Sequence, residues 1–249
     1  MDRLSNNKTG LSPQAPALSA LSLLRGALTG VARTIAPGQN VSVEGAKRET
    51  VIGVVSGLIR FFRMTPDGRR HISRFVHAGG LIGVGMNITY RNSAEAVTTS
   101  KIIVFRAKSI EAGAGEDPVI RNAVFQALTE ELTARDRTQL RLGRLLADER
   151  VADFLLELSD EAGDGVAASS AIVMSRADMA DHLGVTIETV SRALHRFQKL
   201  GWLRLTDARH FTILRSGALR SFASGDSDIA LPSYRLSHAN EREALQCAA

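Results

Sequence analysis

The chain has 249 residues, of which 44% are hydrophobic and 23% are charged, a composition typical of a soluble folded protein with room for two modest domains. Its single cysteine, Cys247, stands near the end of the chain, which excludes a disulfide framework and a cysteine-ligated zinc or iron–sulfur site within one chain. No run of about 18 apolar residues indicates a membrane span, so we expect a cytoplasmic protein that does not enter a membrane.

The first 30 residues lack the pattern of a folded domain. Ser, Arg and Gly interrupt the apolar segment 15–31, which has neither the basic start nor the cleavage site of a secretory signal. We therefore expect residues 1–30 to be a flexible N-terminal extension that passes into a short helix.

Residues 31–114 are expected to form a compact β domain, because β-branched and aliphatic clusters alternate with turn residues from Gly38 to about Phe105. The turn signal Pro66-Asp67-Gly68 predicts a hairpin between two of its strands. The predicted strands cover residues 51–55, 58–64, 71–76 and 94–105.

A bend rich in glycine follows the third predicted strand, at Gly79, Gly80, Gly83 and Gly85. Glycines of this kind allow a ligand to approach the backbone closely. Tight turns in a β-roll are the simpler explanation, and the segment lacks the Gly-Lys-Ser/Thr ending of a phosphate loop.

Residues 115–145 are expected to form a dimerisation helix, with a helical pattern over 118–143 that Pro118 opens at a permitted first-turn position. Alternating steps of three and four predict a seam between two helices. The seam residues are Phe125, Leu128, Leu132, Arg135, Gln139 and Leu142. A monomer core is the alternative, but about 26 helical residues span roughly 39 Å, more than a small domain needs. Arg135 and Gln139 would weaken the pairing, fix its register or reach outward to solvent.

Residues 146–220 contain two short helical patterns around a tight turn, at 175–201. Ser175 and Asp178 match a capping box, and Gly184 follows the first helix where a left-handed conformation is expected. Thr186 is placed to cap the second helix. Its buried stripe is predicted to be Val190, Ala193, Leu194 and Phe197.

The opposite stripe of the second helix carries groups that read base edges. Arg192 offers two donors to guanine, Glu188 accepts from cytosine, Ser191 serves either role and Ile187 offers a methyl contact to thymine. His195 shares this stripe. The pattern favours a DNA-binding helix-turn-helix, although an amphipathic helix pair with a solvated polar face is also common.

Two further features support DNA binding. Residues 202–214 alternate like two strands around a turn, as in winged versions of the motif. Residues 171–220 hold eight Lys or Arg against four acids, a net of +4 that nearly equals the +5 of the whole chain. The expected contacts to the DNA backbone are Ser175, Thr186, Thr189, Arg196 and Lys199. Residues 221–249 are expected to be a C-terminal tail.

In this order the elements resemble the Crp/Fnr family of transcription regulators from about residue 37 to 220. The resemblance is specific at IETVSRALHRFQKLG, residues 187–201. The weaker motifs occur in the family's order: Glu44-Gly45, Val55-Ser56-Gly57 with Arg60, Asp67 to Arg70, Phe75 to Gly83, Ser93 to Ala96, and Asp148 to Ala152. The implied fold is α+β: a β-roll similar to cyclic-nucleotide-binding domains, a long dimerisation helix and a C-terminal winged helix-turn-helix.

Departures from the family pattern narrow the expected function. The chain lacks the N-terminal cysteines of the oxygen-sensing FNR proteins, and it looks most like the FixK branch, whose members act without that cluster. Where cyclic AMP receptors carry a Glu and an Arg-Ser/Thr pair, this chain has Val84 and Asn92-Ser93, so no cyclic AMP is expected. Those receptors also place an Arg immediately before the Glu of the reading helix, where this chain has Ile187.

The resemblance implies a dimeric activator that reads a TTGAT/ATCAA palindrome in double-stranded DNA and recruits RNA polymerase. Its implied targets are genes of microaerobic respiration or nitrogen fixation. No catalytic residues, cofactor or metal are expected.

Two rival functions remain for comparison. A regulator of the same family gated by haem or by a small ligand is one alternative, and in the haem-gated case His71 or His77 would be the iron ligand. An enzyme of the cupin type needs clustered His and acidic metal ligands, and these two histidines stand six residues apart.

Overall fold

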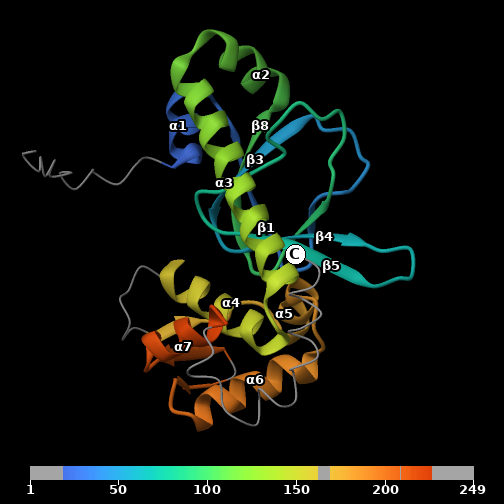
Figure 1. Cartoon of the computed structure of the whole chain (residues 1–249). Helices are drawn as coiled ribbons and strands as arrows, with labels where there is room; N and C mark the ends of the chain where they lie inside the picture. The colour runs from blue at the N-terminus through green and yellow to red at the C-terminus, as the bar shows by residue number, and fades with distance from the viewer. Residues whose placement is uncertain (1–18, 162–168, 208, 226–249) are drawn as a thin grey trace, which may run out of the picture.

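The computed structural model describes residues 19–161, 169–207 and 209–225 (Figure 1). Its N-terminal half is a β-roll of two four-stranded antiparallel sheets, with strand orders β1-β8-β3-β6 and β2-β7-β4-β5. The first sheet contains β1 Val31–Ile35, β3 Thr50–Ser56, β6 Leu81–Ile82 and β8 Ser100–Arg106. The second contains β2 Asn40–Ser42, β4 Ile59–Met64, β5 Arg70–Val76 and β7 Ser93–Ala96.

The two sheets enclose an aliphatic core. Side chains from β3, β4, β5, β7 and β8 are almost fully buried in it, including Ile52, Val54, Ile59, Val76 and Ile102. The β4–β5 hairpin closes through a turn in which Thr65 N donates to Arg69 O at 2.8 Å. Three of the predicted strands and the Pro66-Asp67-Gly68 turn are therefore present.

The prediction of one strand over residues 94–105 is wrong, because this segment forms two strands that belong to different sheets. The chain leaves β7 after Ala96 and enters β8 at Ser100. Leu58 fixes this crossing, since its N–H donates to Thr98 Oγ1 at 3.0 Å and its carbonyl accepts from Val97 N at 2.8 Å. Gly57 has φ +94°, and a Cβ there would lie 2.3 Å from Ser100 Oγ.

Three helices pack beside the first sheet: α1 Ala20–Ala27, α2 Ala107–Glu116 and α3 Pro118–Arg144. The long helix α3 has 27 residues and starts at the N-cap Asp117, whose side chain accepts from Val119 N. α1 lies where the extension was expected to pass into a short helix, and Leu21 and Leu24 are buried in the cluster beside α3. Residues 1–18 of the expected extension lie outside the described residues. A Cβ on Gly53 would lie 2.2 Å from Leu21 Cδ1, so this glycine lets α1 approach β3.

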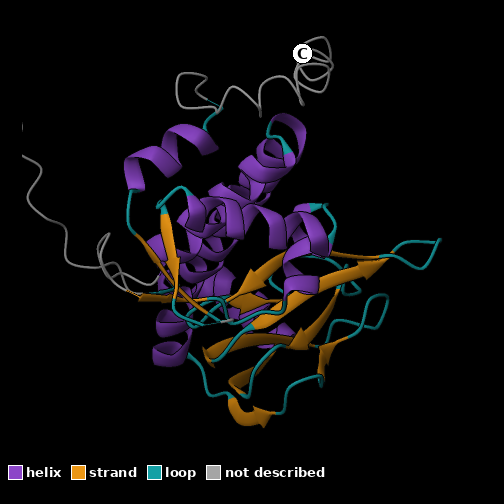
Figure 2. Cartoon of the chain, turned by 90° about the horizontal axis from the view of Figure 1, so that it is seen from below, coloured by secondary structure: helices purple, strands orange, loops and turns teal. Residues whose placement is uncertain are grey.

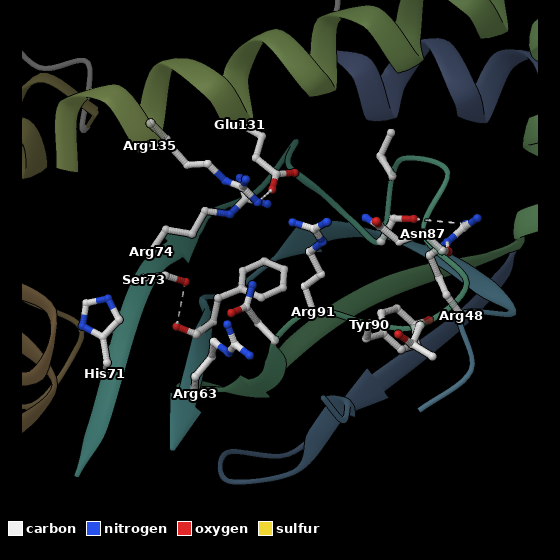
Figure 3. Close-up of a pocket in the computed structure, with 16 residues that line it drawn as sticks. Arg48, Arg63, His71, Ser73, Arg74, Asn87, Tyr90, Arg91, Glu131 and Arg135 are labelled. Atoms are coloured by element: carbon white, nitrogen blue, oxygen red, sulfur yellow. Dashed lines mark hydrogen bonds and ion pairs between the residues drawn. The ribbon is translucent and has the colours of Figure 1, made fainter. Parts of the chain in front are cut away.

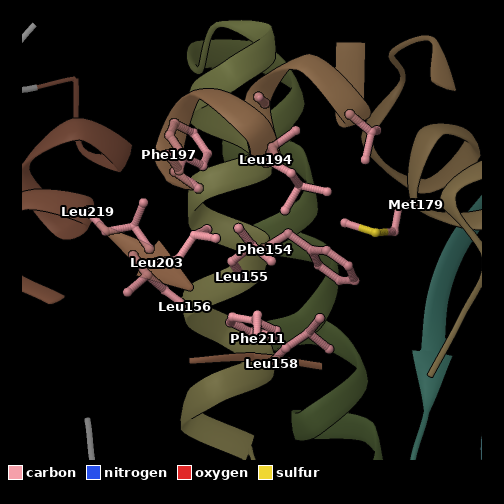
Figure 4. Close-up of a cluster of buried hydrophobic side chains, with 14 of the residues drawn as sticks. Phe154, Leu155, Leu156, Leu158, Met179, Leu194, Phe197, Leu203, Phe211 and Leu219 are labelled. Carbon is pink, nitrogen blue, oxygen red and sulfur yellow. The ribbon is translucent and has the colours of Figure 1, made fainter. Parts of the chain in front are cut away.

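The C-terminal half contains α4 Ala147–Glu161, α5 Arg176–Leu183, α6 Ile187–Lys199 and α7 Ser216–Ala223. A small sheet of order β10-β11-β9 joins β9 Ser169–Ala171, β10 Leu203–Leu205 and β11 His210–Ile213. Figure 4 shows the buried side chains of this half gathered around α4. α7 continues past the expected boundary at 220, because Phe222 and Ala223 are buried in the same core.

The two halves are joined by α3, as Figure 1 shows. In the view from below, the strands of the β-roll lie on one side of the molecule and most helices on the other (Figure 2). Among the described residues, no helix is both long and apolar enough to cross a membrane.

Candidate nucleic-acid interface

The first helix of the predicted motif, α5, begins with the expected capping box. Ser175 Oγ accepts from Asp178 N at 3.0 Å, and Asp178 Oδ2 accepts from Ser175 N at 3.3 Å. The helix ends at Gly184, whose φ of 63° is left-handed. These local interactions satisfy backbone groups at both ends of the helix and fix the tight turn into α6.

The second helix, α6, has the predicted buried stripe. Its residues Val190, Ala193, Leu194 and Phe197 are at most 1% exposed. Thr186 Oγ1 accepts from Thr189 N at 3.2 Å and caps the helix. Because one face is fixed in the core, the opposite face must point outward.

The four predicted base-reading residues come together at the start of α6. Ile187, Glu188, Ser191 and Arg192 line one shallow, open hollow with Thr186. Ile187 is 47% exposed, so its side chain is accessible at this surface. The hollow therefore presents a methyl-bearing side chain, an acceptor, a hydroxyl and a guanidinium on one surface.

Glu188 is held in its charged form. A hydrogen bond from its own backbone N–H is the largest cause that lowers its pKa, followed by a hydrogen bond from Thr186 and the charge of Arg192. A carboxylate accepts hydrogen bonds and donates none, so Glu188 presents only acceptors at this surface.

The predicted backbone contacts divide into two groups. Ser175, Thr186 and Thr189 lie at helix N-termini, where Ser175 and Thr186 act as caps and the Thr186 and Thr189 hydroxyls are 3.2 Å apart. In the last turn of α6, Lys199 is exposed, whereas Arg196 is ion-paired with Asp148 of α4. The sequence pattern of α6 gave no sign of this pair, because Asp148 is distant in the chain.

Arg150, within the motif Asp148 to Ala152, has a structural role that the sequence does not indicate. Its guanidinium donates to the carbonyls of Leu142 at 3.0 Å and Leu183 at 3.1 Å. It thus connects the end of α3 with the end of α5, and it holds the helix-turn-helix against the long helix.

The predicted seam lies on the outer face of α3. Phe125 and Leu132 are 62% and 60% exposed. Leu128 and Leu142 are half-buried, Gln139 is exposed and Arg135 is paired with Glu131 one turn away. Within the described residues, a monomer core does not account for Phe125 and Leu132, the two most exposed apolar side chains of this seam.

A cavity of about 360 Å³ lies between the β4–β5 hairpin, the glycine-rich bend and α3 (Figure 3). Val84 and Asn92 line it, at the positions where the sequence departs from cyclic AMP receptors. The bend itself is built of tight turns, since Gly83 has φ +80° and a Cβ there would meet Thr50 O at 3.0 Å. His71 also lines the cavity.

The cavity is strongly basic. Its lining includes Arg48, Arg63, Arg74, Arg91 and Arg135, with Glu131 as its one acidic residue. Arg74 lies over the ring of Phe61 at 4.8 Å, and Figure 3 shows it reaching toward Arg135 and Glu131. Burial lowers the pKa of Arg74, which means that its charge is incompletely compensated.

Within the described ranges, no group of three or more His, Cys, Asp or Glu is arranged to hold a metal ion.

Comparisons with known proteins match both halves of the chain. A family model described as a Crp-like helix-turn-helix domain matches residues 149–222, and one described as a cyclic nucleotide-binding domain matches residues 32–115. The chain is 37% identical over 179 residues to a nitrogen fixation regulation protein FixK of Azorhizobium caulinodans, covering 71% of this chain and 72% of that one. A FixK of Rhizobium meliloti is 32% identical over 191 residues, which are 77% of this chain and 86% of that one.

Solved structures agree with these relatives. The structure of FixK2 from Bradyrhizobium japonicum matches with a TM-score of 0.73 and 32% identity, covering 78% of this chain and 97% of that one. A CRP-family regulator from Thermus thermophilus, at 21% identity and a TM-score of 0.63, shares the fold over 78% of this chain and 96% of that one.

Proposed function

Because the chain belongs to the Crp/Fnr family of transcription regulators and to its FixK branch, we propose that it is a dimeric activator that reads a TTGAT/ATCAA palindrome. The observation that carries the proposal is the open hollow at the start of α6, where Ile187, Glu188, Ser191 and Arg192 meet. This arrangement fits the major groove of DNA, which admits a helix and presents a distinct pattern for each base pair.

Each of the four side chains has a partner in the proposed half-site. Arg192 donates to guanine, and the Glu188 carboxylate accepts from cytosine. Ser191 lies near thymine, and Ile187 contacts a thymine methyl group. The Glu188 carboxylate is charged at neutral pH and accepts hydrogen bonds through both oxygens.

The DNA backbone is held at the edges of this surface. Thr186, Thr189 and Ser175 contact phosphates near the helix N-termini, where the helix dipole favours negative charge. Lys199 and Arg196 contact phosphates from the last turn of α6. Arg196 shares its charge with Asp148, so Lys199 contributes more of this attraction.

The dimer forms along the outer face of α3. Pairing two copies buries Phe125 and Leu132, which a single chain leaves exposed. The two reading helices then lie one DNA turn apart, about 34 Å, so the symmetry of the protein requires a near-palindromic site.

The activator acts in the cytoplasm, and it acts without cyclic AMP. At the two positions where cyclic AMP receptors bind the ribose and the phosphate, Val84 supplies no carboxylate and Asn92 supplies no guanidinium. It recruits RNA polymerase to genes of microaerobic respiration or nitrogen fixation. The names of the FixK relatives support these targets.

A regulator gated by a small ligand is the second candidate, and the basic cavity favours it. Five arginines line a space of about 360 Å³. Measuring the dissociation constant for DNA while small anions are added at constant ionic strength separates the two candidates. The affinity for DNA stays the same if the activator needs no ligand, and it changes if a bound anion gates the protein.

In vitro selection from random duplex DNA tests the main proposal. We expect enrichment of TTGAT and ATCAA half-sites about one helical turn apart. Enrichment of a single unpaired half-site, or of no sequence, would contradict it.

A further inference from the structure

The helix-turn-helix is attached to the β-roll by a second connection besides the chain itself. Arg70 of β5 donates from Nη2 to Asp178 Oδ1 at 2.7 Å and from Nε to Asp181 Oδ2 at 2.7 Å. Arg60 of β4 donates from Nη1 to the same Asp178 oxygen at 2.8 Å. We call these four residues the interdomain ion cluster. Figure 1 shows α5 beside the β4–β5 hairpin.

The cluster is partly removed from water, most completely at Asp178. The side chain of Asp178 is 3% exposed, and those of Arg60, Arg70 and Asp181 are 16%, 25% and 31% exposed. Arg60 is also ion-paired with Glu95 of β7. Because breaking one partner of a buried ion pair leaves an uncompensated charge, such a cluster resists separation more strongly than surface pairs do.

Apolar contacts lie directly behind the ion cluster. The ring of Phe75, from β5, is centred 5.3 Å from the ring of His182 in α5. Leu58 belongs to the same buried cluster as the core of the helix-turn-helix. The contact is therefore a packed interface and not a single surface ion pair.

The covalent connection alone leaves the orientation of the helix-turn-helix adjustable. α3 ends at Arg144 and α4 begins at Ala147, so two residues join the long helix to the DNA-binding domain. A short link of this kind can act as a hinge. Arg150 and Arg141 brace it on the side of α3, and the ion cluster adds an attachment of α5 to the β-roll.

The docked arrangement leaves the reading surface open. The ion cluster engages α5, whereas the hollow is lined by the first residues of α6 and by Thr186. Ile187 keeps 47% of its surface exposed in this arrangement. The contact therefore does not cover the reading surface.

We propose that Arg70 and Asp181 are positioning residues for DNA binding, which hold the two reading helices of the dimer at the spacing of successive major grooves. The proposal rests on the dimeric palindrome reader described above. It predicts that the ion cluster matters for a full palindrome, which needs the spacing, and not for a single half-site.

The test compares the dissociation constants of the full-length chain for a TTGAT/ATCAA palindrome and for the same duplex with one half-site scrambled. Arg70→Glu should reduce the preference for the palindrome by about tenfold, a usual size of coupling between two sites. Asp181→Asn removes the other end of the Arg70–Asp181 pair and should reduce the preference in the same direction but by less, because Arg70 keeps Asp178. Arg69→Glu is the matched control, because it makes the same charge change at an exposed side chain that pairs only with the nearby Asp67 among the described residues.

Arg70→Gln provides a milder variant, and circular dichroism with thermal unfolding checks that each variant folds. An unchanged preference in folded Arg70→Glu overturns the proposal, as does an unchanged preference in folded Asp181→Asn. Tighter palindrome binding by Arg70→Glu also overturns it, because the contact would then be inhibitory. Wild-type protein that does not distinguish the palindrome from fully scrambled DNA contradicts the proposed function itself.

Discussion

Arg141 of α3 donates from Nη1 to Nε2 of His182 in α5 across 3.3 Å, and this contact assigns the tautomer of a buried imidazole. An arginine only donates, so His182 Nε2 must accept and Nδ1 must carry the proton. That proton is donated to the carbonyl of Ile72 at 2.9 Å. The histidine is therefore neutral and satisfied on both sides.

This neutral histidine predicts a loss of stability in acid. Burial is the main cause that lowers the pKa of His182 to about 4, while the unfolded chain keeps a value near 6.5. Between these values the unfolded state binds the proton more readily, so stability falls as the pH drops from 6.5 toward 4 and is fully present above 6.5. Urea unfolding at pH 7.5 and pH 5 should show a loss of about 2 kcal/mol from this residue.

His182→Asn is the variant that isolates this effect, because its amide still donates to Ile72 but does not titrate. Its loss of stability between the two pH values should be smaller than that of the wild type by that amount. Equal losses in both proteins would mean that other groups cause the acid sensitivity.

Arg141 predicts a large effect of a single substitution. Its side chain is 2% exposed and pairs with Asp153 and Glu157 of α4. Arg141→Met leaves His182 Nε2 without its donor and takes away the cation that pairs with Asp153, while Glu157 keeps Arg137 at 3.4 Å. We expect a cost of roughly 2–4 kcal/mol, below the value for fully buried pairs because the carboxylates are partly hydrated.

Arg144→Met is the control for Arg141→Met, since Arg144 is exposed on the last turn of the same helix. It should cost less than about 1 kcal/mol. Comparable losses in chemical denaturation for the two variants would remove the special role of Arg141.

The outer face of α3 predicts how the dimer can be broken. Leu132→Glu places a charge in the proposed seam and should shift sedimentation from dimer to monomer at micromolar concentration. Leu140→Glu is the matched control, because Leu140 is 63% exposed on the same helix but lies outside the seam. A dimer that survives Leu132→Glu, or that Leu140→Glu disrupts equally, contradicts the proposed interface.

The reading helix predicts two distinguishable losses. Arg192→Ala should cost about 1–3 kcal/mol on the palindrome and relax specificity at one base pair. Lys199→Ala should weaken binding to all sequences alike and lower the salt dependence by about one counterion. Titrations of specific and scrambled duplexes over a range of salt concentration measure both. Equal losses on the two duplexes for Arg192→Ala would rule out the base contact.

The helix-turn-helix could be predicted in detail because its signals are local. Ser175, Gly184 and Thr186 each act on backbone groups within a few residues, so the sequence alone reveals both caps and the turn. The buried stripe of α6 follows from the helical period in the same way.

The features that sequence reasoning missed depend on distant partners. The break between β7 and β8 contains no Gly or Pro, and it is fixed by Leu58, about 40 residues earlier. The short helix α1 was expected, but its packing against α3 was not, because α3 lies about 100 residues later in the chain. Arg70 and Asp178 are 108 residues apart in the sequence, so no local pattern predicts their ion pair.

The measurement that tests the central claim most directly is equilibrium binding of the full-length chain to a TTGAT/ATCAA duplex, with the mass of the complex determined in parallel. We predict two chains per duplex and binding at least about a thousandfold tighter than to scrambled DNA at the same salt concentration. One chain per duplex, or equal affinity for the two sequences, would contradict the account.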